Sequence, residues 1–131
     1  MSIRLAAALL AFGFAAAPAV PALAAVTVRD AQGVAHLNLD TEFIPQLGAG
    51  YYGGSLQLTI TPDGIVNGLF RPDDGSSFHT VTGGLNGDQI WFDIGFQGGV
   101  HVTGILNGDH IVGGTYIGNH LYDFKATPKK S

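Results

Sequence analysis

The feature that most constrains this chain is a two-residue alternation of apolar and polar side chains, which recurs between short glycine-containing turns. Leu56, Leu58 and Ile60 alternate with polar residues, and the run from Ile90 to Phe96 repeats the pattern. A period of two places successive side chains on opposite faces of a β-strand, and no segment beyond the N-terminal region sustains the 3.6-residue period of an amphipathic helix. The sequence therefore predicts an all-β protein with one apolar face.

Turn signals divide the chain into short strands. Asn86-Gly87 and Asn107-Gly108 are typical of two-residue hairpin loops, while Pro62-Asp63-Gly64 and Gln97-Gly98-Gly99 suit three-residue loops with a left-handed glycine at the last position. Residues 40–53 are the least regular segment, and we expect a loop or a single helical turn that plugs one end. Strands are expected near residues 26–30, 34–39, 54–61, 65–71, 77–85, 88–96, 99–106, 109–117 and 120–127.

These strands predict an antiparallel up-and-down β-barrel of about eight strands, because a sheet that closes on itself leaves no exposed edge. A β-sandwich is the alternative. A chain of 131 residues holds one compact domain, which we expect to span residues 25–131. Residues 81–90 recur as residues 102–111 with eight of ten positions identical. Since the matches lie on turn and core residues, we interpret the repeat as one hairpin used twice.

Residues 1–24 have the pattern of a secretory signal peptide. Arg4 supplies a short positive region, an apolar run follows from Leu5 to Ala17, and Ala22-Leu23-Ala24 places small residues at the cleavage positions. We therefore expect removal at about Ala24 and a mature protein that is secreted or periplasmic. No later stretch is long and apolar enough to cross a bilayer as a helix, so no membrane span is expected.

Composition and charge remove several functional classes. A net charge of −4 argues against a nucleic-acid partner, and the absence of cysteine excludes disulfides, thiolate metal sites and cysteine nucleophiles. The five histidines are not spaced as metal ligands on one strand. The segment from Gly48 to Gly53 matches a glycine-rich phosphate motif, but it precedes strands rather than opening a helix. We therefore predict no metal, no cofactor and no catalytic residue.

Turn length decides which side chains share a face of the sheet. A three-residue loop at Gln97-Gly98-Gly99 points His101, His110 and Tyr116 outward, whereas a two-residue turn at the same place points them inward. We favour the longer loop because it keeps both copies of the repeat facing the same way.

The chain also resembles a known family. A strand and a short Asp63-Gly64 turn followed by Ile65–Phe70, the later strand with Trp91 and the closing strand Leu121–Phe124 are similar to segments of the avidin and streptavidin barrels. The resemblance covers about residues 54–127 and implies an exported, ligand-binding barrel. It does not imply biotin, since that family uses several tryptophans and this chain has one. Other calycin-like barrels, including lipocalin-like ones, are similar to the same extent.

Two candidate binding surfaces follow from the expected faces. Inward glycines at Gly68, Gly104 and Gly113 are expected to leave room for a small ligand. The candidate ligand-binding residues of this lumen are His79, Phe92, Tyr122 and Phe70. An apolar strip on the outside of a barrel is typical of a contact surface, and we expect one row to hold Trp91, Ile105 and His110. The candidate partner surface comprises Trp91, Asp93, His101, Ile105, His110 and Tyr116.

The sequence thus predicts an exported, non-enzymatic binding protein that holds a small apolar or amphipathic ligand in a β-barrel. The first alternative is a protein-interaction or self-associating module that uses the outer surface around Trp91, with another protein or a second copy of the chain as partner. The second alternative is an enzyme whose substrate the sequence does not name.

Overall fold

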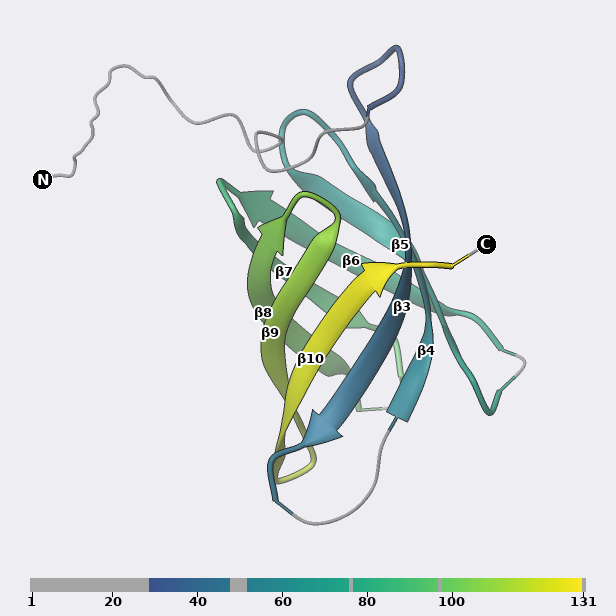
Figure 1. Cartoon of the computed structure of the whole chain (residues 1–131), viewed down its shortest axis with the longest axis vertical. Coiled ribbons are helices and arrows are strands. Elements are labelled where there is room, and N and C mark those ends of the chain that lie inside the picture. Colours follow the sequence, from purple (N-terminus) through teal and green to yellow (C-terminus); the bar gives the residue numbers. More distant parts are fainter. Residues whose placement is uncertain (1–28, 48–51, 76, 97, 131) are drawn as a thin grey trace, which may run out of the picture.

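The computed structural model describes residues 29–47, 52–75, 77–96 and 98–130, and within them the protein is a closed antiparallel barrel (Figure 1). The prediction of an eight-stranded barrel rather than a sandwich is confirmed. The strands are β3 (Ala35–Pro45), β4 (Tyr52–Ile60), β5 (Ile65–Pro72), β6 (His79–Asn86), β7 (Gln89–Ile94), β8 (Val100–Asn107), β9 (His110–Ile117) and β10 (His120–Pro128). Among the described residues, no helix has the length and apolar character needed to cross a membrane.

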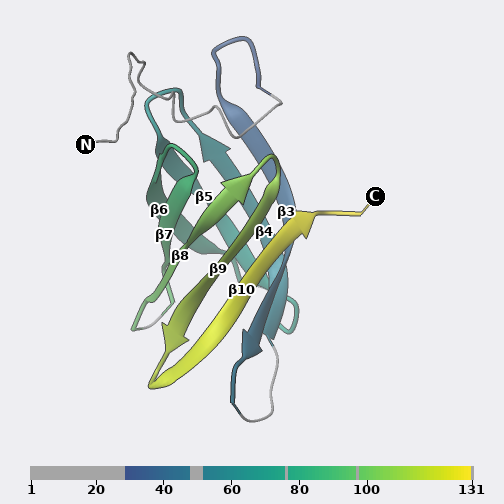
Figure 2. The same ribbon diagram turned by 60° about the vertical axis from the view of Figure 1, so that its left-hand side comes forward.

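Each strand pairs with its neighbours in the sequence, and β10 returns to pair with β3, so that Phe124 lies opposite Phe43. Figure 2 shows β8, β9 and β10 as neighbouring strands on one side of the barrel wall. Closure gives every strand a hydrogen-bonding partner on both sides, which removes the free edges of an open sheet.

The loop at Pro62-Asp63-Gly64 has the predicted form. Ile60 pairs with Val66, and Gly64 has a φ of 89°. The amide of Gly64 donates to the carbonyl of Thr61 at 2.9 Å, which completes the turn.

Three other hairpins differ from expectation by the position of their turns. In the β8–β9 hairpin Asn107 pairs with His110, so the loop consists of Gly108-Asp109 rather than Asn107-Gly108. Asn86 pairs with Gln89, so the loop consists of Gly87-Asp88 rather than Asn86-Gly87, and Gly87 takes the left-handed conformation at its first position. In the next hairpin Ile94 pairs with Val100. Its connection is longer than three residues, because the left-handed backbone of Gly98 and Gly99 reverses the chain only after Phe96.

Each of these differences shifts the strand pairing by two residues, so every side chain keeps its predicted face. His101, His110 and Tyr116 are exposed on the outside, as the favoured arrangement predicted. The pairing across strands nevertheless changes, since Trp91 lies opposite Gly84 and Thr103 instead of forming one row with Ile105 and His110.

The expectation of a loop or helical turn over residues 40–53 is wrong for residues 40–45, 52 and 53, which belong to β3 and β4. Strand β3 continues to Pro45, and it pairs along this stretch with β4 on one side and β10 on the other. Thr41 is buried there because its hydroxyl donates to the carbonyl of Gly54 at 2.9 Å, which satisfies the polar group inside the barrel. Residues 48–51 lie outside the described part of the chain.

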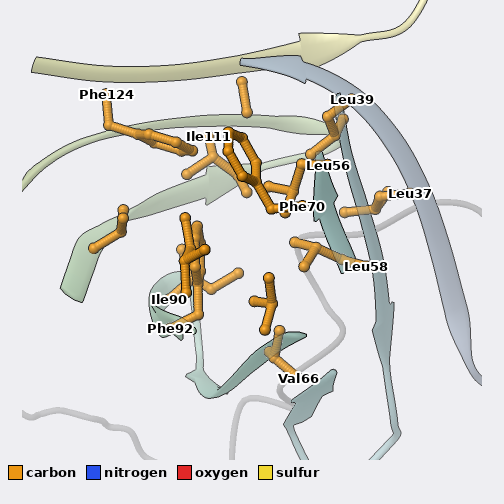
Figure 3. Close-up of a cluster of buried hydrophobic side chains, with 14 of the residues drawn as sticks. Leu37, Leu39, Leu56, Leu58, Val66, Phe70, Ile90, Phe92, Ile111 and Phe124 are labelled. Atoms are coloured by element: carbon orange, nitrogen blue, oxygen red, sulfur yellow. The ribbon is translucent and has the colours of Figure 1, made fainter. Parts of the chain in front are cut away.

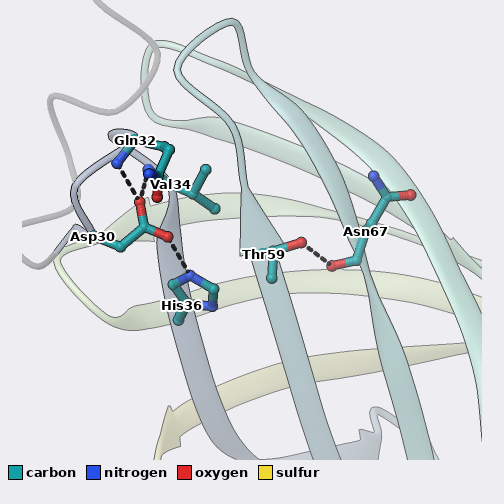
Figure 4. Close-up of polar contacts among 6 residues, drawn as sticks. All are labelled: Asp30, Gln32, Val34, His36, Thr59 and Asn67. Carbon is teal, nitrogen blue, oxygen red and sulfur yellow. Dashed lines mark hydrogen bonds and ion pairs between the residues drawn. The ribbon is translucent and has the colours of Figure 1, made fainter.

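The start of β3 is held by a side-chain turn (Figure 4). The carboxylate of Asp30 accepts hydrogen bonds from the backbone amides of Gln32 at 2.9 Å and Val34 at 3.0 Å. Its second oxygen lies 2.8 Å from Nε2 of His36 on the outer face of β3. The strand expected near 26–30 is not found at residues 29 and 30, and its remainder lies outside the described residues, as does the expected signal peptide.

Alternate side chains from all eight strands fill the interior, and Figure 3 shows part of this apolar core. Phe92 and Phe124 are fully buried, with ring centroids 5.7 Å apart in an edge-to-face arrangement. The ring of Phe124 lies 5.0 Å from that of Phe43, which lies 5.9 Å from that of Phe70. This aromatic chain leads from the middle of the barrel towards one end.

The inward glycines do not create a pocket as expected. A Cβ atom at Gly68 would lie 1.9 Å from the carbonyl oxygen of Gln57, and one at Gly113 would lie 2.0 Å from that of Thr103. These glycines instead allow neighbouring backbones to approach closely where the sheet curves.

Candidate functional site

A cavity of about 660 Å³ opens at one end of the barrel. This end, the lower one in Figure 1, carries the β3–β4, β5–β6, β7–β8 and β9–β10 connections, and we call it the mouth. The cavity is lined by Phe43, Tyr52, Gly53, Phe70, Pro72, Asp73, Asp74, Phe96, Gly98, Gly99, Val100, Ile117 and Gly118.

Strand alternation supplies most of the apolar lining. Phe43 and Phe70 occupy inward positions near the mouth ends of β3 and β5, and Val100 occupies one at the start of β8. Phe96 comes from the β7–β8 connection, where its ring lies 5.7 Å from that of Phe70. The deeper core is filled by side chains, so the remaining space lies between these rings and the mouth.

The polar side of the cavity is formed by the start of the β5–β6 hairpin. The backbone amide of Asp73 donates to the carbonyl of Gly53 at 3.1 Å, which extends the ladder between β4 and β5 by one residue. The amide of Gly75 closes a turn onto the carbonyl of Pro72 at 3.2 Å. Asp73 and Asp74 are both exposed and both line the cavity.

Tyr122 stands beside the cavity and not in its lining. Its ring lies 5.7 Å from that of Tyr52, which does line the cavity. Removal from water raises the pKa of the Tyr122 hydroxyl above its usual 10.0, and the hydrogen bond and charge of Tyr52 raise it further. Tyr122 therefore packs against a lining residue without lining the cavity itself.

The other predicted lumen residues have different positions. Phe70 lines the cavity, whereas Phe92 is buried in the core and does not reach it. The ring of His79 lies 4.2 Å from that of Phe96, and its Nδ1 lies 3.4 Å from the carbonyl oxygen of Gly95. His79 therefore packs against Phe96 of the β7–β8 connection and is not part of the cavity lining.

Sequence reasoning missed several lining residues. Phe43 and Tyr52 belong to the segment expected to be irregular, although the alternation of Leu37, Leu39 and Phe43 with polar residues was a usable signal. Asp73 and Asp74 were not predicted as site residues, because only the tertiary structure places the start of the β5–β6 hairpin beside the cavity.

All six residues of the predicted partner surface are exposed on the outside of the barrel. The carboxylate of Asp93 lies 2.7 Å from Nδ1 of His101, its neighbour on β8. His110 pairs with the adjacent Asp109 at 2.8 Å. These imidazoles lie on the open surface, and the described residues contain no group of three metal-ligating side chains.

Trp91 is the centre of an apolar strip on the outer wall. Its ring lies on Gly84, which leaves no room for a Cβ there: the nearest ring atom would be 2.4 Å away. Gly84 pairs on its other side with Ile65 of β5. Beyond Trp91, Ile105 of β8 pairs with Val112 of β9. We call Ile65, Trp91, Ile105 and Val112 the outer strip; all four are exposed.

Comparison of the chain with protein-family models, with curated proteins and with solved structures finds no significant match. The closed barrel of eight antiparallel strands is compatible with a calycin-like fold. The particular likeness to avidin and streptavidin rests only on the sequence patterns described above.

Proposed function

We propose that this protein is an exported, non-enzymatic binding protein that holds a small apolar or amphipathic molecule at the mouth of its barrel. The observation that carries the proposal is the cavity of about 660 Å³, a volume within the usual range of small-molecule sites, roughly 300–1,000 Å³. Export is supported by the leader-like sequence of residues 1–24.

The chemistry of the lining favours a ligand with an apolar body. Aromatic side chains of Phe43, Phe70 and Phe96 and aliphatic side chains of Val100 and Ile117 form most of it. A few polar groups beside a mainly apolar surface are typical of sites that bind by burial of apolar area and orient by a small number of polar contacts.

The proposal can be tested by filling the cavity from its rim. Ile117 is a partly buried lining residue at the mouth end of β9, and Ile117→Trp places a larger ring in the opening. We expect this variant to bind the neutral dye Nile red at least about tenfold more weakly than the wild type, measured by fluorescence titration.

The matched control is Thr127→Trp on the neighbouring strand β10, because residue 127 is exposed and lies at the end of its strand away from the mouth. This variant should bind the dye as the wild type does. Equal binding by the wild type and Ile117→Trp would contradict a ligand site at the mouth. If Ile117→Trp does weaken binding, mass spectrometry of molecules extracted from protein purified from its own cells would identify the natural ligand.

A second candidate function is supported by the outer strip. Trp91, Ile105 and Val112 are 41%, 45% and 60% exposed and lie on three neighbouring strands. Contiguous apolar surface of this kind is typical of contact with another protein or with a second copy of the chain. Light scattering of the wild type against Trp91→Ala and Tyr116→Ala tests this function. An unchanged mass together with unchanged pull-down partners would exclude it.

A further inference from the structure

We propose that the molecule bound at the mouth is an organic cation, with its apolar or aromatic body in the cavity and a protonated amine beside Asp73 and Asp74. This inference rests on the proposed function and adds the charge of the ligand to it. It follows from an imbalance between the charged groups that line the cavity and those that could neutralise them.

The lining carries negative charge without a compensating positive charge. Among the described lining residues, Asp73 and Asp74 are the carboxylates, and none is lysine, arginine or histidine. In the described part of the chain, neither carboxylate forms an ion pair. By contrast, Asp30, Asp93 and Asp109 each lie within 2.8 Å of a histidine nitrogen.

The nearest basic residue along the chain is directed to the other side of the sheet. Arg71 pairs with Ser55 at an outward position of β5, between the inward-facing Phe70 and Pro72. Its guanidinium lies 5.9 Å from the ring centroid of Phe78. Arg71 lines a separate and smaller hollow on the outer wall, and in the described part of the chain it forms no ion pair with Asp73 or Asp74.

The backbone of Asp73 is attached to the wall of the barrel. The hydrogen bond from the amide of Asp73 to the carbonyl of Gly53 ties the start of the hairpin to β4, and Gly53 itself lines the cavity. This hydrogen bond fixes where the hairpin begins beside the cavity, while both carboxylates stay exposed.

The rest of the lining also discriminates in favour of a cation. The faces of aromatic rings attract positive charge, and Phe43, Tyr52, Phe70 and Phe96 surround the space. An anion of the same shape would meet two carboxylates and no basic side chain from the described lining. A neutral ligand would gain the apolar contact alone.

Three probes with one apolar body and different charges test the inference. They are 1-naphthylmethylamine, which is cationic at pH 7, 1-naphthylmethanol, which is neutral, and 1-naphthoate, which is anionic. Each is titrated against the wild-type protein by displacement of Nile red at low salt. Because an exposed ion pair gives up to about fivefold in affinity, we expect the amine to bind roughly two- to fivefold more tightly than the alcohol. The acid should bind most weakly.

The variant that removes the charge is Asp73→Asn with Asp74→Asn, which keeps the side-chain volumes. It should bind the amine and the alcohol equally, with the affinity for the alcohol unchanged. The matched control is Asp88→Asn with Asp109→Asn, which changes the net charge equally in turns at the opposite end of the barrel. This control should retain the preference for the amine.

The two levels of the proposal fail in different ways. If the alcohol binds but the amine has no advantage over it, the inference about charge is wrong and the proposed binding function stands. If the amine is preferred but the preference survives in the double Asp73/Asp74 variant, the assigned carboxylates are wrong. If none of the three probes displaces the dye, both the inference and the mouth as a site for such ligands are overturned.

Discussion

Several glycines of this barrel are required by contact between backbones. At Gly68 the carbonyl oxygen of Gln57 occupies the place that a Cβ atom would take. Gly104 and Gly113 lie opposite each other on β8 and β9, and each leaves too little space for the other to carry a side chain. A pattern of alternating residues identifies these positions as inward-facing, but it does not reveal that the space beside them is already filled by main chain.

This contact predicts that Gly68→Ala destabilises the protein. The added methyl group meets a carbonyl oxygen of the neighbouring strand, which cannot move without disturbing the ladder, and we expect a loss of about 3 kcal/mol in the free energy of unfolding. Urea denaturation followed by circular dichroism measures it.

Gly75→Ala is the matched control, since its nearest neighbouring atom would lie 3.7 Å away and its backbone does not need glycine. The control should stay within about 0.5 kcal/mol of the wild type. Equal stability of the two variants would mean that the sheet adjusts at Gly68, contrary to the prediction.

At the level of the element, β3 shows why a strand can be longer than its sequence suggests. Asp40, Glu42 and Thr41 weaken the apolar signal, but Thr41 is accommodated inside by its hydrogen bond to Gly54. The backbone of this stretch pairs with both β4 and β10. These long-range hydrogen bonds, not local propensity, extend the strand to Pro45.

The turn before β3 makes a prediction about acid stability. The hydrogen bond from His36, together with the backbone amides of Val34 and Gln32, holds the pKa of the Asp30 carboxyl below its usual 3.8. A carboxyl with a lower pKa in the folded state stabilises the fold above the unfolded value and loses this contribution as the pH falls through the folded value.

We therefore expect part of the acid destabilisation of the wild type below about pH 4 to be absent in Asp30→Asn, because the variant has no carboxyl to protonate there. Urea midpoints measured from pH 2.5 to pH 7 provide the comparison. Asp63→Asn, in the β4–β5 loop, controls for the loss of one carboxylate. Parallel curves for the wild type and Asp30→Asn over the acid range would show that this turn does not contribute.

On the scale of the whole molecule, the two ends of the barrel differ because their connections differ. Tight loops such as Pro62–Gly64 and Gly87-Asp88 bring neighbouring strands together at one end, where Ile60, Leu85 and Ile90 fill the interior. The connections at the mouth include the longer β5–β6 and β7–β8 segments. Longer connections do not force side chains from opposite walls together, so a cavity remains above Phe43 and Phe70.

The sequence by itself determined the class of fold and, for most strands, which residues share a face. Alternation with a period of two needs only local information, and a shift of two residues in a hairpin leaves every face unchanged, which is why Phe70 and the exposed Trp91 were assigned correctly. Only the tertiary structure decided where the interior is full and where it is hollow. That outcome depends on the curvature of the closed sheet and on distances between residues far apart in the chain. As a result, Phe92 lies in the filled core, whereas Asp73 and Asp74 line the cavity.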